Sequence, residues 1–341
     1  MPKNPLSKTA CALALLIFCL AFGPAVALAQ STTQGAVGGM VKDPQGAVVK
    51  GAAVTVKNEE TNKEFSATTD DEGRFRVVQL DPGNYVVTIN ASGFAAYTQQ
   101  KVVVEVGRVT PLDVDLSITG AQETVQVTSE APVINTEQQD FSTNINQTSI
   151  NNLPINGRRW SNFAILTPGA VPDGTFGLIS FRGISGLLNN NTIDGGDNNQ
   201  AFFSEERGRT RLSYSISQDA VREFQVNTSN YSSEYGRAAG AVTNAVTKSG
   251  TNEFHGNAFF YVRDDKFNAR NPQLTTKPED NRKQFGGTIG GPIVKDRLFF
   301  FFSYDQQKRN FPGISTFGTT TFSSTNFNNA TLLARGLSQA Q

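Results

Sequence analysis

Few residues of this chain have the types and spacing that catalysis or metal binding requires. His255 is the only histidine, and the only cysteines are Cys11 and Cys19. A structural zinc site needs a set of Cys and His ligands that these residues cannot supply once the N-terminal segment is removed. No G-x-S-x-G nucleophile elbow occurs either. We therefore predict a protein that is not an enzyme, with no catalytic residue, metal or cofactor.

The acidic clusters are better explained by solvation than by acid–base or metal chemistry. The carboxylate pairs at residues 205–206 and 264–265 fall in charged segments, and the run at 70–72 falls in a turn. The Asn/Asp-rich run 189–199 could hold a cation, but it lacks the spacing of an EF-hand loop. We expect that run to be a polar loop with a structural turn at Asp194 and Gly195.

The N-terminus has the pattern of a secretory signal peptide. Two lysines precede an apolar run at residues 10–22, and Ala27 and Ala29 form an A-x-A cleavage motif. We predict a signal peptide over residues 1–29 and a mature chain that begins near Gln30. The signal peptide predicts that the chain is exported. Because Cys11 and Cys19 both lie in this segment, the mature chain is expected to be cysteine-free.

Charge and hydropathy narrow the remaining possibilities. The 30 basic and 30 acidic residues balance, which argues against a nucleic-acid partner. Only 38% of residues are hydrophobic, and no apolar run of 18 residues follows the signal, so a transmembrane helix is not expected. Short strand-like segments between Gly, Asn, Asp and Ser turns predict a mostly β chain.

Residues 30–119 have the strand and turn spacing of one small sandwich that folds independently. Seven strand-like segments alternate with turns such as those at residues 43–46, 70–73 and 81–84. The pattern resembles the carboxypeptidase regulatory-like domain, which implies a transthyretin-like β-sandwich without peptidase activity. The matching residues are Gly39, Asp43, Gly46, Ala53, Val54, Thr69, Gly73, Phe75, Leu80, Pro82, Gly83, Tyr85 and Gly93.

The linker at residues 120–139 contains a short β-prone segment. It resembles a TonB box, which an energy-coupling protein would grip by adding a strand. A terminal strand of the sandwich or an ordinary linker would explain the same pattern. The candidate residues are Glu123, Thr124, Val125, Gln126 and Val127.

Residues 140–248 resemble the α+β plug domain of TonB-dependent outer-membrane receptors, and residues 152–158 resemble the Oar-like branch of that family. The matching plug-motif positions are Arg182, Gly183, Asp194, Gly195, Tyr235, Gly236, Gly240 and Asn244, with further matches at Glu223, Ser232, Ala239, Thr247, Lys248 and Gly250. Two positions depart from the family pattern. Ala241 replaces a glycine and Thr243 an apolar residue, so the last plug strand is expected to pack differently.

Residues 249–341 resemble the first strands of a transmembrane antiparallel β-barrel. Three arms at residues 253–262, 284–293 and 298–304 approach the length of about 9–11 residues that a membrane-spanning strand needs. A short charged turn at 294–297 joins the last two. His255 alternates out of phase with Phe254 and is expected to face the lumen or the periplasmic rim. A soluble sandwich with Phe-rich strands is the alternative.

The resemblance implies a TonB-dependent transporter in the cell outer membrane, with its N-terminal domain in the periplasm. Its partners would be a TonB-type energy-coupling protein, outer-membrane lipid and an unidentified ligand that binds the outer plug loops. A non-transporting surface binding or adhesion protein is the rival interpretation. Family members resemble 22-stranded barrels, so three arms predict a truncated product that cannot close a pore alone.

Overall fold

The structure is a computed structural model. It describes residues 32–118, 141–155, 158–173, 178–201, 215–231, 235–270, 272, 277 and 279–310. The predicted signal peptide and the TonB-box candidate, Glu123 to Val127, lie outside the described residues. Two compact units comprise residues 1–255 with 290–301, and residues 256–289 with 302–341. Among the described residues, no helix combines the length and apolar character needed to cross a bilayer.

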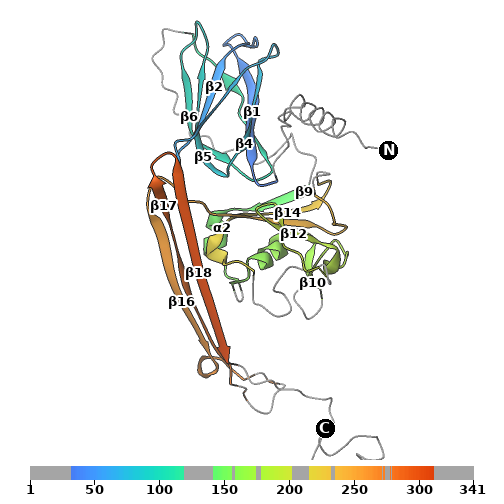
Figure 1. Cartoon of the computed structure of the whole chain (residues 1–341). Coiled ribbons are helices and arrows are strands. Elements are labelled where there is room, and N and C mark those ends of the chain that lie inside the picture. Colours follow the sequence, from blue (N-terminus) through green and yellow to red (C-terminus); the bar gives the residue numbers. More distant parts are fainter. Residues whose placement is uncertain are drawn as a thin grey trace, which may run out of the picture. The chain divides into compact units, whose positions relative to one another are not determined.

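The N-terminal region is a two-sheet β-sandwich, as predicted (Figure 1). One sheet has the order β3-β2-β5-β6, and the other has the order β4-β1-β7 with β8 also pairing with β1. The strands are β1 (Gly35–Lys42), β2 (Ala53–Asn58), β3 (Glu64–Thr68), β4 (Arg74–Leu80), β5 (Gly83–Asn90), β6 (Tyr97–Val104), β7 (Val109–Pro111) and β8 (Val114–Asp115).

The last of the seven strand-like segments, residues 111–118, is not one strand: only Pro111 belongs to β7, and Val114 and Asp115 form β8. Pro111 ends β7 because it has no N–H to continue a ladder. Shortly after it, the Asp113 carboxylate accepts the backbone N–H of Met40 on β1 at 2.9 Å, in place of a backbone partner. The sixth strand-like segment was expected at residues 101–106. The corresponding strand, β6, begins earlier, at Tyr97, and ends at Val104.

The sandwich core follows from the alternation of apolar residues along each strand. Val54 and Val56 of β2, and Val87 and Ile89 of β5, are completely buried between the sheets. Tyr85 is also buried, and its hydroxyl donates to the carbonyl of Asp81 at 2.7 Å. Burial raises the pKa of Tyr85 to about 12.

A five-stranded mixed sheet with the order β13-β12-β15-β14-β9 follows in the chain. Only the β12–β15 pair is parallel. A separate hairpin pairs β10 with β11. The elements are β9 (Phe141–Ile145), α2 (Gln147–Asn152), η2 (Trp160–Leu166), β10 (Ala170–Asp173), β11 (Leu178–Phe181), η3 (Gly186–Leu188), β12 (Asn190–Ile193), β13 (Gly196–Asp197), η4 (Gln218–Ala220), β14 (Val221–Ser229) and β15 (Val242–Thr247).

One face of the mixed sheet packs on the helical segments. Trp160 and Phe163 of η2 are buried against it, and the rings of Trp160 and Phe224 meet edge-to-face with centroids 5.4 Å apart. Val226 and Ala245 complete this apolar face. The short helices therefore cover the side of β14 and β15 that carries apolar residues.

The C-terminal strands β16 (His255–Asp264), β17 (Asn281–Val294) and β18 (Leu298–Asn310) form a sheet in that order, and η5 (Asp265–Phe267) follows β16. The three predicted arms are confirmed as strands, but their bounds were wrong. β16 starts two residues late because Thr251 Oγ1 donates to the Glu253 carbonyl in a local turn (3.0 Å). β17 begins three residues early, at Asn281, and β18 extends six residues past its predicted end, into polar residues.

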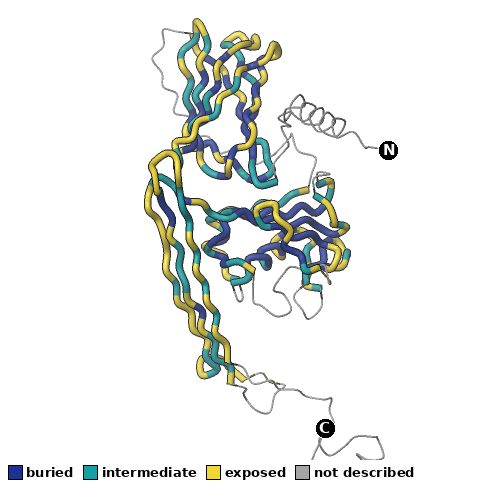
Figure 2. The backbone as a smooth tube through the Cα atoms, viewed as in Figure 1, coloured by how far each residue is buried: buried dark blue, intermediate teal, exposed yellow. Residues whose placement is uncertain are grey.

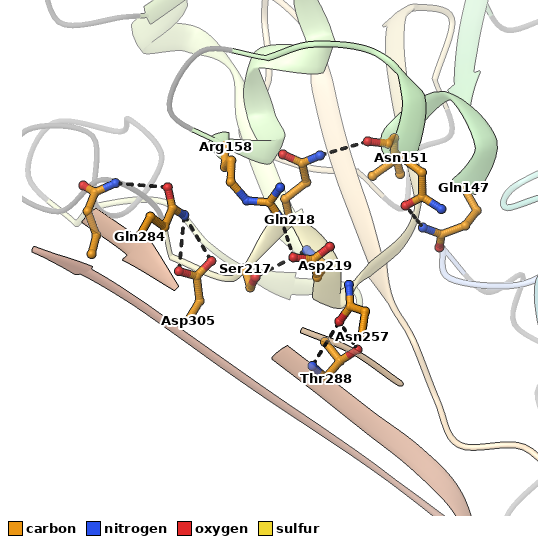
Figure 3. Close-up of polar contacts among 12 residues, drawn as sticks. Gln147, Asn151, Arg158, Ser217, Gln218, Asp219, Asn257, Gln284, Thr288 and Asp305 are labelled. Carbon is orange, nitrogen blue, oxygen red and sulfur yellow. Dashed lines mark hydrogen bonds and ion pairs between the residues drawn. The ribbon is translucent and has the colours of Figure 1, made fainter. Parts of the chain in front are cut away.

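Both faces of this sheet carry aromatic residues: Phe260 lies on one, and Phe259 and Tyr261 lie in phase with Asn257 on the other. One carries aromatic rings that remain largely exposed, including Phe260 (65% exposed) and Phe302 (60%). On the other, Thr288 Oγ1 donates to Asn257 Oδ1 at 2.7 Å, and Gln284 Nε2 donates to the Asp305 carboxylate (Figure 3). Figure 2 shows how much of these strands is exposed.

Candidate functional site

Two dipeptides of the predicted plug motif form tight turns. Arg182 and Gly183 have φ of 53° and 80°, and Asp194 and Gly195 have φ of 49° and 76°. Two successive residues with positive φ are the requirement of a type I′ hairpin turn, which explains the glycine in each pair. The second turn links β12 to β13, where Ile193 pairs with Gly196. The predicted turn at Asp194 and Gly195 is confirmed.

The Asp194 carboxylate fastens its turn to the end of β15. It accepts the backbone N–H and the hydroxyl of Thr247, each at 2.8 Å, while its own N–H donates to the Ala245 carbonyl at 2.9 Å. Both carboxylate oxygens are therefore engaged within the protein. This geometry gives Asp194 a structural role.

The backbone of Gly236 and the missing side chain of Gly240 both contact buried asparagines. Asn190 Nδ2 donates to the Gly236 carbonyl at 2.7 Å, and Tyr235 directly precedes that glycine. A Cβ at Gly240 would lie 2.3 Å from Asn189 Oδ1, so a larger residue would displace that side chain. Asn189 in turn accepts the N–H of Ala241 at 3.0 Å.

The prediction that residues 189–199 form a polar loop was wrong for its first half. Residues 190–193 are the strand β12, and Asn189, Asn190 and Asn191 are buried. Their amides are satisfied by the protein instead of water. Asn199 binds both neighbouring residues of β12, donating to Asn190 Oδ1 at 2.7 Å and accepting the Asn191 N–H at 2.9 Å.

A row of polar side chains crosses the second face of the mixed sheet. It takes one residue from each strand, and the residues are opposite one another in the ladder: Asp197, Thr192, Asn244, Gln225 and Asn144. We call this the polar row. At its centre, the fully buried Asn244 accepts the Thr192 hydroxyl at 2.7 Å and donates to the Thr32 carbonyl at 2.6 Å.

The burial of this polar face is not apparent from the sequence. Glu223 was noted only as a motif match, and Gln225 was not noted at all. The strand alternates Glu223, Gln225 and Asn227 with the apolar Phe224 and Val226, a pattern that predicts a solvated polar face. In the structure all three polar residues are at least 95% buried.

The segment Ser217–Gln218–Asp219 connects three parts of the region (Figure 3). Gln218 Nε2 donates to the Ile150 carbonyl of α2 at 2.9 Å, and the Asp219 carboxylate pairs with Arg158. Both charged side chains of this pair are largely buried. Lys248 is half-buried nearby, and desolvation lowers its pKa although Asp219 opposes the shift.

The arrangement favours binding and rearrangement of hydrogen bonds over covalent chemistry. Across the described ranges, no three His, Cys, Asp or Glu side chains gather in a way that could hold a metal ion. His255 Nδ1 lies 3.1 Å from the Glu253 carbonyl and 3.3 Å from Thr251 Oγ1, so a turn accounts for its contacts.

Two regions of the chain match known protein families. Residues 36–117 match the family described as a carboxypeptidase regulatory-like domain, and residues 246–335 match an outer membrane beta barrel domain. The sandwich and the C-terminal strands thus each belong to a recognised module. Together they define an outer-membrane β-barrel protein with an N-terminal regulatory-like sandwich.

The relatives are TonB-dependent proteins. The TonB-dependent transporter Oar of Myxococcus xanthus is 28% identical over 298 residues, which cover 83% of this chain and 27% of Oar. The probable TonB-dependent siderophore receptor PirA of Acinetobacter baumannii is 28% identical over 149 residues, 42% of this chain and 17% of PirA. The crystal structure of PirA aligns at 23% identity with a TM-score of 0.38, over 50% of this chain and 25% of that one.

The chain is thus similar to TonB-dependent proteins of the outer membrane, Oar among them. It spans about a quarter of the length of Oar and less of PirA. The predicted resemblance to TonB-dependent receptors, the mostly β fold class and the outer-membrane location are confirmed.

Proposed function

We propose that this chain provides the sandwich, the plug and membrane strands of a TonB-dependent outer-membrane transporter that moves an unidentified substrate with energy coupled from the inner membrane. The observation that carries the proposal is the order of the modules. A regulatory-like sandwich, a mixed sheet and barrel-type strands follow one another, and similarity to the Oar transporter covers 83% of the chain.

In this proposal the mixed sheet, within residues 140–248, is the plug. Asp194, Gly240 and Asn244 support that role through their contacts between β12, β15 and the neighbouring loops. Such a polar interior exchanges one set of hydrogen bonds for another at little net cost, because each bond contributes only about 1 kcal/mol when water can replace it. A plug must rearrange in this way to open a path.

The proposed partner is a TonB-type protein, and the proposed contact is the segment Glu123 to Val127. Val125→Pro removes a backbone donor from a strand that TonB would have to extend. We expect the mature chain in detergent micelles to bind a TonB periplasmic domain, and Val125→Pro to weaken binding at least tenfold in titration calorimetry. Val133→Pro, in the same linker but outside the segment, is the matched control.

Two results would contradict the proposal at different levels. Equal binding by Val125→Pro and by the unmodified chain would remove the assignment of residues 123–127. Absence of binding by the unmodified chain would contradict the transporter and favour a surface binding or adhesion protein.

A further inference from the structure

The turn between β6 and β7, residues 105–108, makes an unusual contact with the second face of the mixed sheet. We call it the docking turn. Its central residue, Val106, has no exposed surface although it belongs to a loop of the sandwich. Its N–H donates to both oxygens of the Glu223 carboxylate, at 3.1 and 3.2 Å. A side chain of β14 thus accepts a hydrogen bond from the backbone of a sandwich loop.

The carbonyl of the same residue is held as well. Gln225 Nε2 donates to the Val106 carbonyl at 2.9 Å, and Asn144 Nδ2 does so at 3.1 Å. Asn144 Nδ2 also donates to Glu223 Oε1 at 2.7 Å. Two members of the polar row and one carboxylate therefore satisfy both backbone groups of Val106, as a neighbouring strand would do.

The close packing of the docking turn against β14 favours glycine at position 107. Gly107 has φ of +66°, and a Cβ there would lie 2.8 Å from Gln225 Nε2. A second point of attachment joins Arg222, beside Glu223, to Glu60 of the sandwich at 2.8 Å. The sandwich is therefore attached to β14 at two places that are separated along its chain.

The face of the mixed sheet that contacts the docking turn is polar, and some of its hydrogen-bonding atoms lack partners. Among the described residues, Asn144 Oδ1 and Asn227 Oδ1 are buried without a hydrogen-bond donor. A buried polar atom without a partner forfeits the hydrogen bonds that water would give it, so each such atom favours separation. A docked state with this deficit is held less strongly than an apolar interface of the same size.

We propose that the docking turn and the polar face of β14 and β9 form a releasable latch between the sandwich and the mixed sheet, and that protonation of Glu223 closes it. The sandwich turn is the partner that this face fits, and the Glu223 carboxylate is the group through which pH acts. The latch stands independently of the proposed transport activity.

The charges around Glu223 set the direction of the pH effect. Burial raises its pKa to about 7, and the nearby Glu105 adds to the shift, while the Val106 N–H, Asn144 and Arg108 oppose it. Arg108 is itself paired with Glu105 at 2.9 Å. The docked state thus binds a proton more tightly than the released state. Docking is strongest below about pH 4.5 and weakens as pH rises through about 7.

Amide hydrogen exchange of Val106 tests the latch, because this N–H donates to Glu223. The experiment uses the mature chain in detergent micelles and expresses protection relative to intrinsic exchange at each pH. We expect protection of Val106 on the order of tenfold greater at pH 5.5 than at pH 8. Amides of β5 and β15 report whether the sandwich and the mixed sheet remain folded.

Variants separate the charge from the contact. Glu223→Gln keeps an acceptor without a charge, so Val106 should stay protected at both pH values. Glu223→Ala removes the acceptor and should abolish protection at both. Glu105→Gln should move the transition to lower pH, and Glu64→Gln, on the exposed strand β3, should change nothing. Low protection at every pH with both folds intact would overturn the docking, and pH-independent protection of the unmodified chain would overturn the role of Glu223.

Discussion

The sandwich and the mixed sheet are both built from short β-strands, but different side chains fill the space beside those strands. In the sandwich, valines, leucines and an isoleucine from two sheets meet in one apolar core. The mixed sheet has such a core on one face only, whereas asparagines, a glutamine and a glutamate are buried on the other. The sandwich therefore depends mainly on buried apolar area, and the mixed sheet depends in addition on a complete set of hydrogen bonds.

The largest expected effect tests the apolar half of this comparison. Ile89→Ala removes a completely buried side chain of β5 and should lower the free energy of unfolding of residues 30–119 by about 3 kcal/mol. Urea denaturation of this fragment, followed by circular dichroism, gives the value. Val103→Ala, which changes a side chain that is 43% exposed, is the control and should cost far less. A fragment without a cooperative transition would contradict the independent sandwich.

A smaller loss of stability is expected when a buried hydrogen-bonding side chain of the mixed sheet is replaced. Asn244→Leu keeps a similar volume but leaves the Thr32 carbonyl and the Thr192 hydroxyl without their shared partner. The cost should be about 2 kcal/mol, because buried polar groups lose solvation as well as a bond. Trp160, the only tryptophan, lies in the core of the mixed sheet and reports its unfolding by fluorescence in the mature chain.

The control for that experiment is Asn84→Leu, at an exposed position of the sandwich. It should leave the Trp160 transition unchanged. If Asn244→Leu proved as stable as the unmodified chain, the polar row would have no role in stability and the contrast between the two regions would fail.

The smallest expected effect is the loss of a single hydroxyl group from the sandwich core. Tyr85→Phe removes the bond to the Asp81 carbonyl and should cost about 1 kcal/mol at neutral pH. Because burial raises the pKa of Tyr85, the sandwich should also lose stability as pH rises from about 10 to 12, and Tyr85→Phe should lose less.

Urea titrations of the 30–119 fragment at several pH values measure both effects. Tyr97→Phe is the comparison variant, since burial raises the pKa of that tyrosine too. An equal loss of stability at high pH in Tyr85→Phe and in the unmodified fragment would show that Tyr85 does not titrate there.

Much of the fold could be predicted because it depends on local patterns. Alternating valines and turn residues predict the sandwich strands, and a glycine in each of the pairs Arg182–Gly183 and Asp194–Gly195 marks a turn with positive φ. The Gly-rich arm and the run of phenylalanines on either side of a short charged turn likewise predict the C-terminal strands β17 and β18. In each case the residue type restricts the backbone or the face directly, within a few positions of the chain. The function of Glu123 to Val127 stays a prediction.

The tertiary structure alone decided which polar residues are buried. Residues 189–191 and the alternating Glu223, Gln225 and Asn227 have the pattern of solvated segments, yet all are covered. A hydrogen-bonding side chain can be satisfied by water or by a distant group, and its own type does not say which. Here the partners are Thr32 and Val106, which lie 212 and 119 positions from Asn244 and Gln225 in the sequence. Contacts at that separation arise only when the chain folds back and places those backbone groups over the sheet.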